Sequence, residues 1–119
     1  MRKFLIECPL LFLVLVFALF LSTGCAKRAH LSASVERYEY SSSTGQVDVH
    51  ILVRNDGQRD VGRYDIRYKI TYDSSAYEDS TRGLNLSAGE SRTEYAITSI
   101  GTGKTVSDVS VTDVKWKVQ

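Results

Sequence analysis

The sequence is poor in cysteine and in proline, and both shortages limit what the protein can be. Its 119 residues include two cysteines and one proline, and all three, Cys8, Pro9 and Cys25, lie near the N-terminus. The rest of the chain therefore has no disulfide and no thiolate for metal binding or nucleophilic catalysis. Any fold that it forms must be stabilised by a packed core alone.

An excess of charge of either sign is also missing. The formal net charge is +1, and the segment after Gly24 carries 13 basic and 13 acidic residues, since Arg2, Lys3 and Glu7 precede it. Domains that bind nucleic acid usually show a clear basic excess. We therefore expect no nucleic-acid partner and no strong electrostatic attraction to anionic lipid.

The N-terminus carries a targeting pattern. Met1-Arg2-Lys3 comes before an apolar run from Leu10 to Leu21, which is followed by Ser22-Thr23-Gly24-Cys25. A basic start, an apolar stretch of about a dozen residues and a small-residue cleavage site are typical of a secretory signal. Because it ends on Gly-Cys, the segment resembles the signal of bacterial lipoproteins. The resemblance implies a signal peptide over residues 1–24, cleavage before Cys25 and attachment of lipid to that cysteine.

Two other interpretations of this segment stay open, an ordinary secretory peptide and an uncleaved anchor. A membrane-spanning helix needs about 20 mostly apolar residues, and the stretch from Phe4 to Leu21 is interrupted by Glu7, Cys8 and Pro9. All three interpretations place the rest of the chain outside the cytosol. In lipoproteins an Asp after the cysteine favours the inner membrane, so Ala26 implies an outer-membrane location, facing the periplasm or the cell surface, in a cell that has one.

The remainder of the chain has the alternating pattern of β-strands and no convincing helical period. Six or seven short strands in about 90 residues, with turns every 8 to 15 residues, predict an all-β protein with an antiparallel β-sandwich over residues 31–119. Residues 25–30 are expected to form a short tether. The expected strands are 31–40, 47–53, 64–72, a weak edge strand at 76–81, 94–100 and 106–118.

Three expectations concern single positions in these strands. Val109 and Val111 share one parity while Val114 and Trp116 share the other, which predicts a β-bulge near 112–113. Trp116 is expected to be the large filler of the core. In the strand 94–100, Tyr95 and Ile97 are expected to point inward.

Several turns resemble those of small immunoglobulin-like extracytoplasmic domains of the FxLYD and CARDB-like type. The residues concerned are Val53-Arg54-Asn55-Asp56-Gly57, the strand end Tyr72-Asp73, and Leu86-Ser87-Ala88-Gly89-Glu90, where Ala88 replaces the usual Pro. Lys69 and Thr71 replace the Phe and Leu of the FxLYD pattern. The resemblance implies an immunoglobulin-like fold used for adhesion or scaffolding and supplies no catalytic residue.

Motifs for chemistry are few. Gly101-Thr102-Gly103-Lys104-Thr105 resembles the end of a phosphate loop, but Thr98 stands where the earlier Gly is needed, so we interpret it as a hairpin turn. His30 and His50 lack partners at zinc-ligand spacing. Asn55-Asp56-Gly57 with Asp60 offers oxygens to Ca²⁺ but lacks the acidic residue that closes an EF-hand loop. We expect no metal, no cofactor and no enzymatic activity.

Tyrosine is the one abundant contact-forming residue, with seven in the chain. Tyr38 and Tyr40 lie opposite Leu31, Ala33 and Val35 in the alternation, so they are expected to be exposed and to contact a protein or glycan, or else to form a cross-strand pair. The sequence thus favours a lipid-anchored envelope protein whose sandwich binds or scaffolds another envelope component. The alternatives are a secreted or phage-encoded factor that blocks a surface receptor and, third, a small envelope enzyme. The oligomeric state stays open.

Overall fold

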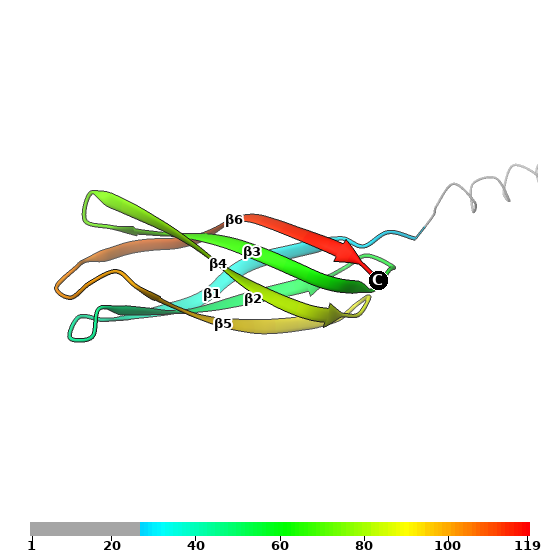
Figure 1. The fold of residues 1–119 in the computed structure, drawn as a ribbon, viewed down its shortest axis with the longest axis horizontal. Coiled ribbons are helices and arrows are strands. Elements are labelled where there is room, and N and C mark those ends of the chain that lie inside the picture. The colour runs from blue at the N-terminus through cyan, green and yellow to red at the C-terminus, as the bar shows by residue number, and fades with distance from the viewer. Residues whose placement is uncertain (1–26) are drawn as a thin grey trace, which may run out of the picture.

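The structure, a computed structural model, describes residues 27–119, which form six antiparallel strands (Figure 1). The predicted signal peptide, Cys25 and Ala26 lie outside the described residues. The C-terminus lies at the same end of the domain as residue 27, and we call this the tether end. The strands are β1 (Leu31–Ser41), β2 (Gln46–Asn55), β3 (Val61–Tyr72), β4 (Ser75–Leu86), β5 (Ser91–Ser99) and β6 (Val106–Val118).

The strands form two three-stranded sheets that face each other, with the orders β1-β2-β5 and β4-β3-β6. On one long side of the sandwich β1 lies against β6, and on the other β5 lies against β4. The predicted all-β antiparallel β-sandwich is therefore confirmed, with six strands. The expected weak edge strand at 76–81 is part of a twelve-residue strand, β4. The turn at 101–103 is not a hairpin, because it links strands of different sheets.

The core is formed by the two central strands, β2 and β3, whose alternate residues point inward as the sequence predicted. A β-strand directs successive side chains to opposite faces, so an apolar residue at every second position builds one buried face. Burying such a side chain completely contributes about 1.5–3 kcal/mol relative to leaving it exposed. The central residues with 0% exposure are Val47, Val49, Ile51 and Val53 of β2 and Val61, Tyr64, Ile66, Tyr68 and Ile70 of β3.

A β-bulge lies within each of the outer strands β1 and β6. At each bulge, the side chains that point inward change from odd-numbered to even-numbered positions. In β6, Arg67 pairs with Asp113 and Tyr68 with Val111, so Thr112 is the extra residue and the predicted bulge is confirmed. In β1, the pairing partners show that Glu36 is extra. The residues after Glu36 therefore face the other way from those expected by simple alternation.

Two side-chain predictions are wrong. Tyr95 and Ile97 are 70% and 62% exposed, and Ala96 and Thr98 point inward in their place. Trp116 is only half-buried and packs against the margin of the core. The space inside the sandwich is filled instead by the long side chains of Tyr64 and Tyr68 from β3.

Candidate functional site

The first residues that the structure describes are already hydrogen-bonded to the sandwich. Gln58 N donates to Arg28 O at 2.6 Å, and Asp56 N donates to His30 O at 2.9 Å. A Cβ on Gly57 would overlap the backbone of residues 28–30, so a glycine is needed where the two segments approach. Arg28, placed in the tether by the sequence analysis, is thus hydrogen-bonded to the domain three residues after Cys25.

His30 adds a side-chain contact to this attachment. Its Nδ1 lies 2.6 Å from Asp56 Oδ1, and its ring meets that of Trp116 edge to face at 6.2 Å. The hydrogen bond with His30 is the main cause that lowers the pKa of the Asp56 carboxyl below its usual value. His30 therefore ties the tether to both β6 and the turn after β2.

The turn after β2 is organised by Asn55, which is fully buried. Its Oδ1 accepts from Gly57 N at 3.0 Å and from His30 N at 3.4 Å, and its Nδ2 donates to Arg59 O at 2.8 Å and Leu86 O at 3.2 Å. Asn55 Oδ1, which the calcium interpretation required as a ligand, is thus already hydrogen-bonded within the protein. The oxygen of Asp60 is also engaged, since it accepts from Ala88 N at 2.9 Å. Within residues 27–119, no three His, Cys, Asp or Glu side chains gather as metal ligands.

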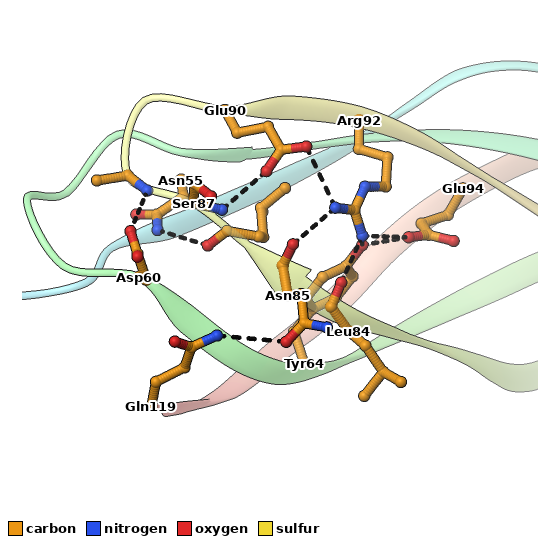
Figure 2. Close-up of polar contacts among 12 residues, drawn as sticks. Asn55, Asp60, Tyr64, Leu84, Asn85, Ser87, Glu90, Arg92, Glu94 and Gln119 are labelled. Carbon is orange, nitrogen blue, oxygen red and sulfur yellow. Dashed lines mark hydrogen bonds and ion pairs between the residues drawn. The ribbon is translucent and has the colours of Figure 1, made fainter.

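Arg92 connects β5 with β4 at the tether end (Figure 2). Its guanidinium donates to Leu84 O at 2.6 Å, to Asn85 O at 2.7 Å and to Glu90 Oε2 at 3.2 Å. Glu90 in turn accepts from Ser87 N at 2.8 Å, and this bond, followed by Arg92, lowers the pKa of the Glu90 carboxyl. These hydrogen bonds give partners to polar groups at the end of β4 and the start of β5. We therefore assign the group a structural role.

The two buried tyrosines of β3 reach across the core to polar groups on β5. Tyr64 OH donates to the Glu94 carboxylate, and Tyr68 OH lies 2.6 Å from Thr98 Oγ1, which donates to Asp79 Oδ2 at 2.8 Å. Burial raises the pKa of both tyrosines above the usual value, and for Tyr64 the bond to Glu94 raises it further. A buried tyrosine hydroxyl needs a partner. This need explains why β5 presents Glu94 and Thr98 inward.

The predicted exposure of Tyr38 and Tyr40 is wrong. The bulge at Glu36 turns both side chains inward, where they are half-buried and pack against the core. Tyr40 OH donates to Gly101 O at 2.7 Å and accepts from Lys104 N at 2.9 Å. These contacts give Tyr40 a structural role in joining β1 to the turn before β6, and the pair loses the exposure on which its predicted partner contact depended.

The exposed aromatic surface lies on β5 instead. On the outer face of the β1-β2-β5 sheet, Tyr95 stands opposite His50 with the rings edge to face at 4.7 Å. Ile97 is the next outward residue on β5, and Leu52, half-buried, is the next on β2. We call Leu52, His50, Tyr95 and Ile97 the β5 patch. Alternation predicted the apolar residues of this strand correctly but assigned Tyr95 and Ile97 to the inner face.

The outer face of the other sheet is charged. Asp65 pairs with Arg82 at 2.9 Å, and a shallow hollow of about 290 Å³ is lined by Asp65, Arg67, Ser80, Asp113 and Lys115. Exposed ion pairs of this kind contribute about 0–1 kcal/mol and keep a surface solvated. The two outer faces thus differ, because the charged face exposes Leu84 next to Arg63, whereas the other face exposes Tyr95 and Ile97 together.

Comparisons of the chain with protein-family models, with curated proteins and with solved structures found no match. In the part of the chain that the structure describes, no helix has the length and apolarity needed to cross a membrane. The assignment of a site therefore depends on geometry, which favours the β5 patch as the candidate contact surface.

Proposed function

We propose that this protein is a lipid-anchored binding module of a bacterial cell envelope, held at the membrane through Cys25, and that it uses the β5 patch to contact another envelope protein. The observation that carries the binding role is the 70% and 62% exposure of Tyr95 and Ile97 on one sheet face. Tyrosine is among the residues that most often anchor protein interfaces, and the exposed Ile97 adds apolar area that a partner can bury.

The chemistry of the patch favours a protein over a glycan as the partner. Ile97 and Leu52 add aliphatic surface beside Tyr95, and such surface gains from burial against apolar side chains. On the β1 side the patch is bordered by the charged residues Arg37, which lies opposite His50, and Glu39. An apolar centre with a polar rim is the usual anatomy of a protein interface.

The anchor supports this role through proximity. Arg28 is hydrogen-bonded to the domain, so only residues 26 and 27 separate the lipidated residue from the sandwich. A short tether confines the module to the membrane surface and raises its effective concentration near partners there. Two or three acyl chains anchor a protein firmly, whereas one holds it only marginally.

The anchor is tested by the intact mass of the protein extracted from membranes, wild type beside Cys25→Ala. We expect residues 25–119 plus acyl chains, with the lipid absent from the variant. An unmodified chain cut near Cys25, or an intact 119-residue chain, would overturn the lipid anchor.

The contact surface is tested by photo-crosslinking in intact cells, with the crosslinker at position 52 in the β5 patch and, as the matched control, at Arg67 on the charged face. We expect a protein adduct of defined mass from position 52 only. Equal adducts from both positions would overturn the assignment of the face. An adduct that a cell-wall hydrolase removes and a protease leaves intact would show a glycan partner and contradict the protein.

A further inference from the structure

The sandwich has four edge strands, and one of them is unlike the others. Each of β1, β4, β5 and β6 ends a sheet and so carries backbone N–H and C=O groups that its own sheet does not use. An unprotected edge is a template for pairing with another strand, and proteins protect edges with bulges, charges and covering groups.

The edges β1 and β6 are protected by bulges and charges. Glu36 bulges out of β1 beside Arg37, and both residues are exposed. In β6, Ser107 and Thr112 are extra residues in the pairing with β3. The Asp113 carboxylate also accepts from Val114 N at 3.0 Å.

The edge β4 is protected by side chains that occupy its backbone groups. Asp79 Oδ1 accepts from Ser80 N at 2.8 Å, and Arg92 donates to Leu84 O and Asn85 O. Asn85 has a φ of 56°, a left-handed conformation that interrupts the extended backbone there. A further strand therefore has little continuous edge to pair with.

In the described part of the chain, the edge β5 has neither a bulge nor a side chain bonded to its backbone, and its two charged residues, Arg92 and Glu94, lie in the inner row. It pairs with β2 over nine residues without a register shift. Among residues 27–119, no side-chain hydrogen bond ends on the backbone of 91–99, in contrast to β4. Its outward row is uncharged and includes the exposed Tyr95 and Ile97. The row consists of Ser91, Thr93, Tyr95, Ile97 and Ser99.

We propose that β5 pairs with the β5 of a second copy of this chain, antiparallel and about a twofold axis at Tyr95, so that two β1-β2-β5 sheets join into one six-stranded sheet. In this register Tyr95 faces the same residue of the second copy, and Thr93 faces Ile97. Twofold symmetric pairing of one surface with itself is the commonest arrangement of homodimers.

The charges of β5 favour its pairing with a second copy of the same strand in one particular register. Opposite residues in an antiparallel pair lie on the same face, so the strand can shift against its copy only in steps that preserve inner and outer rows. A register centred on Glu94 would oppose two carboxylates. The register centred on Tyr95 places Glu94 opposite Ala96 and Arg92 opposite Thr98, and it uses all nine residues. The strand is therefore complementary to itself.

Strand pairing at an edge joins two sheets side by side. The outer face of each β1-β2-β5 sheet therefore stays accessible, and the dimer presents two such faces. The two β5 patches then lie next to each other across the axis. The tether end lies beside Ser91, which pairs with Arg54 next to the attached residues 28–30. Antiparallel pairing directs the two tether ends in opposite directions along the strands. The inference stands on β5 and does not depend on the lipid anchor.

Disulfide cross-linking in the full chain tests the pairing and its register. Directly opposed Cα atoms in antiparallel strands are about 4.5–5.5 Å apart, within the range that a disulfide requires. We expect Tyr95→Cys to give a linked homodimer. We also expect Thr93→Cys and Ile97→Cys to link when the two variants are coexpressed with different tags, with a yield roughly tenfold above either variant alone.

The matched controls are the unsubstituted chain, which reports any background from Cys25, and Tyr77→Cys on β4, which is also exposed. Tyr95→Cys that remains monomeric while its circular dichroism matches the wild type would overturn the proposal. Linkage of Tyr95→Cys to a different protein would overturn it too, as would an Ile97→Cys homodimer as abundant as the mixed pair.

As a second measurement, analytical ultracentrifugation in detergent should show that Tyr95→Lys shifts the full chain from dimer to monomer. An unchanged dimer would contradict the pairing.

Discussion

The two long sides of the sandwich are closed by different chemistry. Where β1 meets β6, half-buried apolar residues pack against the core, and we call this the apolar side. Where β4 meets β5, hydroxyl, carboxylate and guanidinium groups bond to one another, and we call this the polar side. The residues of the apolar side are Ala33, Val35, Tyr38 and Tyr40 of β1 and Val111, Val114 and Trp116 of β6.

The difference follows from how each strand meets the tyrosines of β3. On the apolar side, the bulges at Glu36 and Thr112 turn aromatic and aliphatic side chains inward. On the polar side, β5 has no bulge, and the side chains of Tyr64 and Tyr68 already fill the space in front of it. The strand supplies hydrogen-bond acceptors to these tyrosines, and its own large apolar residues face solvent.

The comparison teaches that the two sides should respond differently to substitution. Apolar packing is non-directional and tolerates changes that conserve volume at a cost below about 1.5 kcal/mol. A buried hydrogen-bond network depends on geometry, and loss of one partner costs about 1–3 kcal/mol. The polar side should therefore be the more sensitive of the two.

The largest effect is expected from Gly83→Ala on β4, because a Cβ at this position would overlap the ring and hydroxyl of Tyr64. Overpacking costs about 1–3 kcal/mol, and the displaced hydroxyl would lose a bond to a charged group. We expect the free energy of unfolding to fall by about 3 kcal/mol in denaturant titrations. The control is Gly62→Ala, whose nearest neighbour is the flexible Gln119 side chain at 3.3 Å. Equal effects of the two variants would show that the polar side is not tightly packed.

A smaller loss is expected from Arg92→Met, which keeps the apolar stem and removes the donors to Leu84 O, Asn85 O and Glu90. We expect about 1–2 kcal/mol in denaturant titrations, and a smaller difference at 1 M salt because charges are screened. Arg82→Met is the matched control. It breaks an exposed pair with Asp65 and should cost less than about 0.5 kcal/mol. A loss as large for Arg82 as for Arg92 would contradict the role assigned to the polar side.

Much of the fold follows from the alternation in the sequence, because β2 and β3 are central and regular. Every second residue of Val47–Val53 and of Tyr64–Ile70 is apolar or aromatic and is buried. The bulge in β6 was predicted because apolar residues change parity between Val111 and Val114. The same signal exists in β1, where parity changes between Val35 and Tyr38, and it would have placed Tyr38 and Tyr40 inside.

The orientation of β5 could not be predicted from its own residues. Tyr95 and Ile97 alternate with Ala96 and Thr98, and the larger apolar pair is the obvious choice for the inner face. What reverses this choice is the length of tyrosine side chains on another strand, together with the need of their hydroxyls for partners on β5. The contacts of Asn55 with His30 and Leu86 join residues distant in sequence in the same way, and no local pattern reveals them.

The polar side should also weaken at alkaline pH. Burial raises the pKa of Tyr64 and Tyr68 above the usual value of 10.0, so below pH 10 these phenols are neutral in both the folded and the unfolded state. As the pH rises through 10, the unfolded chain ionises first, so the free energy of unfolding falls, by up to about 1.4 kcal/mol per pH unit for Tyr64. In titrations between pH 10 and 12, Tyr64→Phe should reduce this slope. Tyr95→Phe, on the solvent face, is the control and should leave the slope unchanged. An unaltered slope in Tyr64→Phe would contradict the buried contact with Glu94.

The smallest effect is expected where the apolar side continues into the tether, at Asp56. Asp56→Ala removes the acceptor of His30. The amide of Gln58, which donates to Arg28 O, should therefore lose protection from hydrogen exchange, while the free energy of global unfolding is unchanged.

In the wild type, the protection of the Gln58 amide should decrease as the pH is lowered. Because the bond to His30 lowers the pKa of Asp56 from 3.8, the contribution of the carboxylate is present above that value and is lost as the pH falls through the lowered one. Asp60→Ala, which frees Ala88 N instead, should leave Gln58 protected. Loss of protection in β5 as well would show that the tether and the polar side form one cooperative unit, and the contrast between the two sides would then fail.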